Sequence, residues 1–376
     1  MNKICWQINL QRRFGGGEVY TAFMARALRA RGWETHTIVA RDADFWKRLD
    51  LGDTTLHPVR DPAQISELLT AHKDVVFHHG APSPDLRIDR PLLAIAHMPV
   101  HDRDPEPFRP CYRVLGVSRY VIRTLRERGL SNVHGEPLYG VADLTRMAPE
   151  ERRITARSRF DWDERKLRDR SFKRLEPGYR LFVPTRVFSP RPGLSLGIVS
   201  RLTTIKQFPA LMTILAPIIA RHSGVNLEIF GAGGWRSVKD LEAVLEPIQE
   251  RVRWWGFQHD VRRVYGLVDF VLGGLPEQEA LGLNLLEAQA AGAPVLAPDA
   301  PPFDETVEHG FGGFRYVDPR EDGGADFERL LGRLITGLRP EPPRTGHLRR
   351  FDLDAFGERL ERALPGAPVN NANDGR

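Results

Sequence analysis

Two acidic residues in the second half of the chain have a spacing that suits a sugar nucleotide. Glu279 and Glu287 lie eight residues apart, and the sequence predicts a helix that opens near Leu281, with Glu287 in its second turn. Eight helical residues span about 12 Å, roughly the distance from the ribose of a nucleotide to an attached sugar. Both carboxylates accept hydrogen bonds from hydroxyl groups, and the helix N-terminus between them favours a diphosphate.

Two basic residues precede this helix in the sequence. Arg201 and Lys206 follow the predicted strand Leu194–Val199. Ligands of open α/β sheets bind at the carboxyl ends of the strands, where an arginine can fork onto phosphate oxygens and a lysine adds a point charge. The acidic pair and the basic pair are each, on their own, also typical of ordinary surface charges. The presence of both pairs in one predicted domain is what indicates a diphosphate site.

Strands and helices alternate in both halves of the chain, and this alternation must position the charged residues. Short connections between alternating strands and helices favour a parallel, doubly wound sheet. The expected strands are listed here: Lys3–Ile8, Glu34–Ala40, Val75–His79, Leu92–His97, Val114–Ser118, Val133–Leu138, Leu194–Val199, Asn226–Phe230, Val252–Phe257, Asp269–Gly273 and Pro294–Ala297. The sequence predicts an α/β protein with two Rossmann-like domains that face each other across a cleft.

The domain boundaries follow from where this pattern weakens. The predicted domains are residues 1–190, with an Arg-rich insertion near 150–185, and residues 191–350. A final helix and a loose tail occupy 351–376. A length of 376 residues fits two or three domains.

Composition argues against a secreted, a membrane-spanning or a disulfide-stabilised protein. The N-terminus lacks the apolar core of a signal peptide, and no stretch approaches the roughly 20 apolar residues of a membrane-spanning helix. Cys5 and Cys111 are far apart and outside any C-x-x-C motif, which favours a reducing cytoplasm over a disulfide framework or a metal site.

Several segments, in the right order over about residues 1–340, resemble the retaining glycosyltransferase family 4, which has the GT-B fold. The E-x7-E motif corresponds to Glu279 and Glu287, and the phosphate-binding cations correspond to Arg201 and Lys206. The other matching segments are Gly15–Glu18, Val117-Ser118, Tyr139–Asp143, Glu228–Gly234 and Trp255–Phe257.

The resemblance implies a role for each matching residue. Arg201 and Lys206 would stabilise the leaving diphosphate, Glu287 would hold the ribose and Glu279 the donor sugar. His97, at the end of a predicted strand, would lie beside the donor sugar; a lone histidine there is as often a satisfied core group. The remaining donor-binding candidates are Gly16, Gly17, Gly231, Gly233, Phe257, Gly282 and Leu283.

The sequence departs from the family pattern at a few positions. Ala280-Leu281-Gly282 replaces the usual Pro-Phe-Gly, and Tyr139 replaces an asparagine. Glu277 is a second candidate for the sugar-contacting carboxylate, although the spacing favours Glu279. These departures concern the identity of the donor sugar more than the type of reaction.

The function that we predict is transfer of a hexose, with retention of configuration, from a nucleotide-diphosphate sugar to a saccharide or lipid-linked acceptor. We expect a cytoplasmic enzyme of surface polysaccharide synthesis that needs no metal or other cofactor. Two alternatives remain: a nucleotide-sugar epimerase of the same fold, and a catalytically silent nucleotide-sugar-binding protein.

The segment Arg152–Arg174 is rich in Lys and Arg, and it carries Phe160, Trp162 and Phe172. A solvated insertion explains this composition. A contact with an anionic membrane, at whose inner face the enzyme would then act, explains it too, because basic and aromatic side chains bind such a surface. No nucleic-acid-binding module is recognisable, and we expect no nucleic-acid partner.

Overall fold

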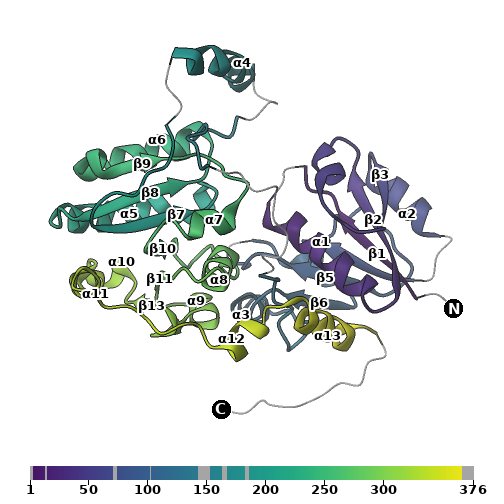
Figure 1. The fold of residues 1–376 in the computed structure, drawn as a ribbon. Helices are drawn as coiled ribbons and strands as arrows, with labels where there is room; N and C mark the ends of the chain where they lie inside the picture. Colours follow the sequence, from purple (N-terminus) through teal and green to yellow (C-terminus); the bar gives the residue numbers. More distant parts are fainter. Residues whose placement is uncertain are drawn as a thin grey trace. The chain divides into compact units, whose positions relative to one another are not determined.

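The computed structural model describes residues 3–12, 15–70, 74–101, 103–142, 153–162, 167–182 and 186–365. Contacts divide the chain into two compact units, Met1–Val141 with Arg349–Arg376, and Ala142–Leu348. Each unit is a parallel sheet with helices packed against it (Figure 1). The predicted class of two doubly wound α/β domains is therefore confirmed.

The sheet of the first unit has six strands in the order β3-β2-β1-β4-β5-β6. The strands are β1 (Lys3–Asn9), β2 (Trp33–Ala40), β3 (Thr55–Val59), β4 (Val75–His79), β5 (Leu92–Ala96) and β6 (Arg113–Gly116). All five pairings are parallel. The central strands are almost wholly buried, as expected for a parallel sheet that is covered on both faces.

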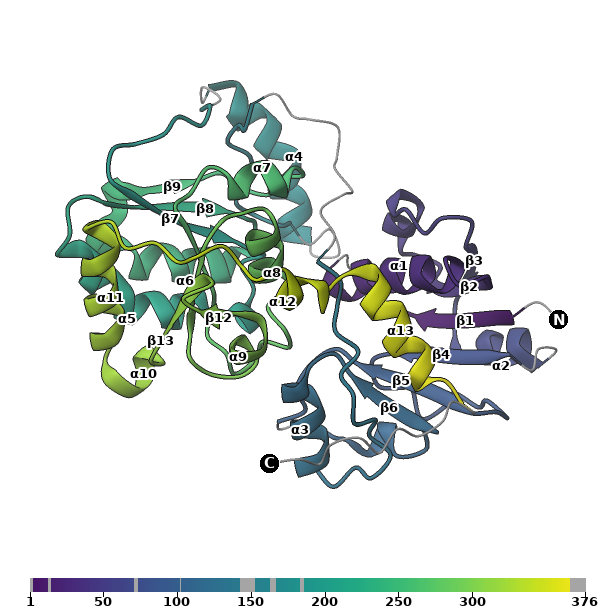
Figure 2. The same ribbon diagram turned by 60° about the horizontal axis from the view of Figure 1, so that its bottom comes forward.

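Amphipathic helices cover this first sheet. They are α1 (Gly16–Arg29), α2 (Pro62–Thr70), α3 (Arg119–Glu127) and α13 (Leu353–Ala363), with short 3-10 turns η1 (Asp44–Arg48) and η2 (Glu106–Phe108). In α1, Tyr20, Phe23, Met24 and Leu28 recur with the helical period and are buried. The C-terminal helix α13 begins at the capping residue Asp352 and returns to pack beside α1 (Figure 2).

The sheet of the second unit has seven strands in the order β12-β13-β11-β10-β7-β8-β9. The strands are β7 (Leu194–Val199), β8 (Val225–Phe230), β9 (Val252–Trp254), β10 (Phe270–Leu272), β11 (Val295–Pro298), β12 (Glu308–His309) and β13 (Gly312–Tyr316). Every pairing in this sheet is parallel.

The helices of the second unit are α4 (Leu167–Phe182), α5 (Phe208–Ala220), α6 (Trp235–Val244), α7 (Val261–Tyr265), α8 (Leu283–Ala290), α9 (Phe303–Thr306), α10 (Pro319–Asp322) and α11 (Ala325–Ile335). The 3-10 turns are η3 (Thr204–Lys206) and η4 (Glu246–Arg251), and α12 (Thr345–Arg349) lies at the boundary of the units. Within the described ranges, no helix is long and apolar enough to cross a membrane.

The topology of each sheet reverses at one place. The strand order changes direction between β1 and β4 in the first unit, and between β7 and β10 in the second. Loops at the carboxyl ends of the strands that flank such a reversal bind ligands in open α/β proteins. The candidate residues Arg201, Lys206 and Glu279 follow β7 and β10, and His97 follows β5, next to β4.

The segment after residue 142 differs from our expectation. The sequence pattern predicts that residues up to 190 belong to the first domain, whereas the described part of this segment lies with the second unit. Backbone contacts hold it there, because Phe160 pairs with Gly233 and the N–H of Arg157 donates to the carbonyl oxygen of Trp255 (2.9 Å). The segment also contains α4, a helix that its Arg- and Pro-rich composition did not suggest.

One predicted strand is wrong. Val133–Leu138 runs beside β6, but only Val133 makes a ladder bridge, to Val114. Pro137 has no N–H to donate, which interrupts the ladder.

Candidate active site

The two predicted cations lie on the loop between β7 and α5. The turn η3 ends at Lys206, and Gln207 then adopts a left-handed conformation (φ 51°) before α5 begins. Among the described residues, Gln207 is the one non-glycine residue with positive φ. Backbone strain of this kind persists only where the surrounding structure imposes it, often at functional sites.

Lys206, Glu279 and Glu287 come together at the switch point of the second sheet. The ammonium group of Lys206 forms an ion pair with Glu279, and its charge also acts on Glu287. Gly274, just after β10, permits this approach: a Cβ at that position would lie 2.3 Å from the carbonyl oxygen of Lys206. The loop after β7 therefore packs directly against the loop after β10, which carries Glu279.

Glu279 is buried and its carboxylate is oriented by the backbone. Its Oε1 accepts hydrogen bonds from the N–H groups of Ala280 (3.3 Å) and Gly282 (3.2 Å). Gly282, with a φ of 79°, lies directly before the first residue of α8, Leu283. The alternative acid, Glu277, instead pairs with Arg320 at 3.1 Å and is half exposed.

Glu287 projects from the second turn of α8, as the sequence predicted. Its Oε2 accepts a hydrogen bond of 3.0 Å from the hydroxyl of Tyr265, a buried residue at the end of α7. Burial raises the pKa of Glu287, and the Tyr265 hydroxyl and the Lys206 charge offset part of that rise. Sequence reasoning missed Tyr265, because nothing in its local pattern marks it.

Arg201 lies on the same loop and faces the inserted segment. Its guanidinium forms an ion pair of 3.3 Å with Asp161, and both side chains are substantially exposed. An exposed pair of this kind contributes little to stability, so a phosphate could replace Asp161 at low cost. Asp161 is a second residue that sequence reasoning missed.

Gly231 and Gly233 allow two loops of the second unit to approach each other closely. A Cβ at Gly231 would lie 1.9 Å from the carbonyl oxygen of Ser200, and one at Gly233 would lie 2.1 Å from that of Leu202. The glycines therefore let the loop after β8 pack against the loop that carries Arg201. In contrast, a Cβ at Gly16 or Gly17 would meet no atom within 4 Å.

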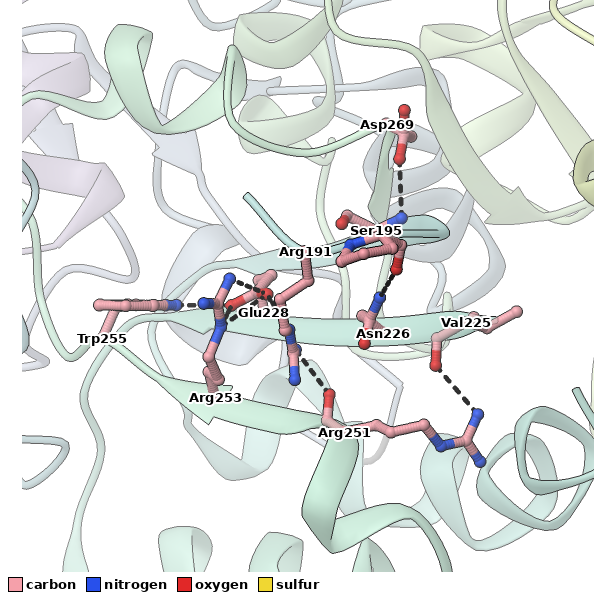
Figure 3. Close-up of polar contacts among 10 residues, drawn as sticks. Arg191, Ser195, Val225, Asn226, Glu228, Arg251, Arg253, Trp255 and Asp269 are labelled. Carbon is pink, nitrogen blue, oxygen red and sulfur yellow. Dashed lines mark hydrogen bonds and ion pairs between the residues drawn. The ribbon is translucent and has the colours of Figure 1, made fainter. Parts of the chain in front are cut away.

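A buried ion cluster holds the neighbouring Trp255–Phe257 loop (Figure 3). Glu228 in β8 is fully buried, and it accepts hydrogen bonds from Arg191, Arg253 and the indole of Trp255. Gly256 follows with a φ of 67°, and the side chain of Phe257 is 43% exposed. The anchored side chain of Trp255 therefore fixes the start of this loop, while the side chain of Phe257 stays at the surface.

In the first unit, His97 belongs to a chain of polar side chains. Its Nε2 lies 3.0 Å from Nδ1 of His79, whose Nε2 lies 3.0 Å from Oε1 of the buried Gln7. The ring of Tyr20 packs edge-on against His97, with centroids 4.8 Å apart. Burial lowers the pKa of His97 to about 4 and that of His79 well below its usual value, so both rings are neutral at neutral pH.

This burial predicts a pH dependence of stability. In the unfolded chain these histidines have a pKa of about 6.5 and bind protons below that pH. In the folded protein His97 is protonated only near pH 4. Stability of the first unit is therefore expected to fall as the pH drops from about 6.5 towards 4, by about 2 kcal/mol at pH 5 for His97 alone.

Hydrogen exchange measures this loss. Amides of β1 and β5 should lose protection between pH 7 and pH 5, after correction for the intrinsic exchange rate, while amides of β8 serve as the internal control. Replacing His97 with Gln should reduce the loss. Equal protection of β1 at both pH values would contradict the prediction.

One candidate residue lies outside the residues that the structure describes. Asp143, which completes the Tyr139–Asp143 segment, is not among the described residues. Within the described ranges, no group of three His, Cys, Asp or Glu side chains could hold a metal ion. Cys5 and Cys111 are both free, buried thiols.

Comparison with known proteins finds a family match within the second unit. Residues 193–336 match the family described as glycosyl transferases group 1. No curated protein matches the chain. Among solved structures, HepE of Anabaena in complex with UDP and glucose has a TM-score of 0.67 at 16% identity, covering 96% of this chain and 99% of HepE.

Two further structures are similar over the same share of this chain. The lipopolysaccharide outer core galactosyltransferase WaaB has a TM-score of 0.66 at 18% identity, with 98% of WaaB covered. Sucrose-phosphate synthase from Thermosynechococcus elongatus has a TM-score of 0.67 at 15% identity, with 98% of that chain covered. Residues 193–336 are therefore similar to the glycosyl transferases group 1, and the chain has the GT-B fold, with two α/β units.

Proposed function

We propose that this protein is a glycosyltransferase that moves a hexose from a nucleotide-diphosphate sugar to a saccharide or lipid-linked acceptor, with retention of configuration. The observation that carries the proposal is the cluster of Lys206, Glu279 and Glu287 at the switch point of the second sheet. Support also comes from HepE, which binds UDP and glucose, and from WaaB, a galactosyltransferase of the lipopolysaccharide outer core.

The donor diphosphate would lie between the cations and the N-terminus of α8. Lys206 would exchange part of its contact with Glu279 for a phosphate oxygen, and Arg201 would exchange Asp161 for another. The first N–H groups of α8, from Leu283 onward, have no carbonyl partner further up the helix and suit the distal phosphate. The N–H of Gly282 would join them by exchanging its contact with Glu279 for a phosphate oxygen.

The two carboxylates would hold opposite ends of the donor. Glu287, kept in place by Tyr265, would accept hydrogen bonds from the ribose hydroxyls, and Glu279 would accept them from the sugar. We prefer Glu279 to Glu277, because Glu279 contacts Lys206 whereas Glu277 pairs with Arg320. The nucleobase would lie near Gly231, Gly233 and Phe257.

The reaction breaks the bond between the anomeric carbon and the phosphate oxygen, and forms a bond from that carbon to the acceptor oxygen on the same face. The acceptor hydroxyl gives its proton to the departing phosphate oxygen. Lys206 and Arg201 would stabilise the charge that develops on the diphosphate. His97, neutral and with its ring held by His79, would lie beside the sugar, with Gly16 and Gly17 leaving room for the backbone to approach it.

Exclusion of water from the donor site would let transfer outcompete hydrolysis. No metal or other cofactor takes part in this proposal. We place the reaction in the cytoplasm, in surface polysaccharide synthesis, where the two free thiols of the protein stay reduced.

A nucleotide-sugar screen tests the proposal. The thermal unfolding temperature should rise with one of the UDP-, GDP-, ADP- or dTDP-sugars, because ligand at 100 times its Kd stabilises a protein by about 2.7 kcal/mol. Replacing Glu287 with Ala should abolish the shift. A nucleotide sugar that is epimerised without an acceptor would favour the epimerase alternative, and the absence of a shift with every donor would contradict the proposal.

A further inference from the structure

The helix α4 carries the most exposed apolar side chains in the described part of the protein. The side chain of Leu167 is 75% exposed and that of Leu175 is 68% exposed, more than any other large hydrophobic residue that the structure describes. The two leucines are eight residues apart, about 12 Å along one side of the helix. Exposing two leucine side chains to water does not stabilise the protein, and exposed apolar side chains of this kind mark sites that bind a protein or a membrane.

The opposite side of α4 is held to the second unit by aromatic stacking. Phe172 stacks on Trp162 (centroids 5.6 Å apart) and on Trp235 at the start of α6 (6.0 Å). Phe160 stacks on Trp235 as well, at 5.0 Å. Figure 1 shows α4 beyond α6, at one end of the second unit. These contacts determine which side of α4 points away from the protein.

The acidic and basic side chains of α4 lie on different sides of the helix. Asp169 is buried, and Glu176 accepts a hydrogen bond of 2.7 Å from the indole of Trp162, so both acids lie on the packed side. Arg170 and Arg174 are exposed and lie between the two leucines along the helix. The outward side of α4 therefore presents apolar groups together with positive charge.

We propose that this outward side of α4, made of Leu167, Arg170, Arg174 and Leu175, binds the surface of an anionic lipid bilayer. A helix at a membrane interface buries apolar side chains among the acyl chains while its basic side chains meet the lipid headgroups. A second copy of the chain suits this surface less well, because the arginines of two copies would repel each other. Nucleic acid would meet the arginines but would leave the leucines in water.

The inference goes beyond the proposed sugar transfer and can be tested without a donor. In the cell it would bring the protein to the surface that carries lipid-linked acceptors. Failure of the membrane contact would leave the donor site intact, so the two proposals can fail separately.

Vesicle flotation with the full chain tests the inference. The protein should float with phosphatidylcholine vesicles that contain phosphatidylglycerol, but not with phosphatidylcholine alone, and added salt should weaken binding. Replacing Arg170 and Arg174 with Gln should lower the partition coefficient about 30-fold, since each basic side chain near an anionic surface contributes a factor of about five and the two factors multiply. Replacing Leu167 and Leu175 with Ser should lower it at least about tenfold.

Matched changes on another exposed helix provide the control. Replacing Arg329 and Arg333 with Gln, or Ile335 with Ser, alters similar side chains on α11 and should leave flotation unchanged. Circular dichroism should show the same helix content for all variants, because every altered side chain on α4 is exposed. No flotation at low salt would overturn the proposal, as would flotation that survives the α4 changes, or binding to an oligonucleotide in place of vesicles.

Discussion

Replacing Lys206 with Met is expected to reduce sugar transfer by about 10²- to 10³-fold, the usual cost of removing one group that stabilises charge in a transition state. The change removes the positive charge and keeps most of the volume of a partly buried side chain. Glu279 keeps its two backbone donors, Ala280 and Gly282, so its carboxylate is not left without partners and the variant should fold.

Two measurements distinguish this effect from a general loss of structure. Turnover with the donor identified by the thermal-shift screen gives the loss of rate, and the unfolding temperature without donor shows whether the fold persists. Lys239 offers a matched control, since it pairs with Glu242 in the same unit and Lys239→Met should transfer sugar like the wild type. Wild-type turnover in Lys206→Met would refute the site.

Replacing Glu228 with Ala should destabilise the second unit by about 3–5 kcal/mol, because it leaves buried positive charge without compensation. The carboxylate of Glu228 is fully buried and is the shared acceptor for Arg191 (2.9 Å), Arg253 (2.6 Å) and Trp255 (2.7 Å). Without it, two guanidinium groups would lie close together at the edge of the sheet. The loop with Phe257 would lose its anchor at the same time.

Urea denaturation checks this prediction. The midpoint of the transition of the second unit should fall for Glu228→Ala. Glu246, an exposed acid on η4, provides the comparison, and Glu246→Ala should change stability by less than about 0.5 kcal/mol. Equal midpoints for the wild type and Glu228→Ala would mean that the arginines find other partners or solvent.

The arrangement of Glu228 shows why some residues escape prediction from sequence. Glu228 opens the segment Glu228–Gly234, which resembles the family, but nothing in this strand pattern indicates a buried ion cluster. Its partners Arg191 and Arg253 are distant in sequence, and only the pairing of β8 with β9 brings Arg253 beside it. Asp161 is similar, since it reaches Arg201 because Phe160 pairs with Gly233. Tertiary contacts of this kind leave no local signal.

Local sequence patterns determined the alternation of strands and helices, and with it the two parallel sheets, because burial on both faces requires continuous apolar strands. They also determined that Glu287 lies in the second turn of α8 and that Arg201 and Lys206 follow β7. Only the tertiary structure decided which side chains meet. The pairing of Lys206 with Glu279, the support of Glu287 by Tyr265 and the outward side of α4 all depend on packing between segments far apart in the chain.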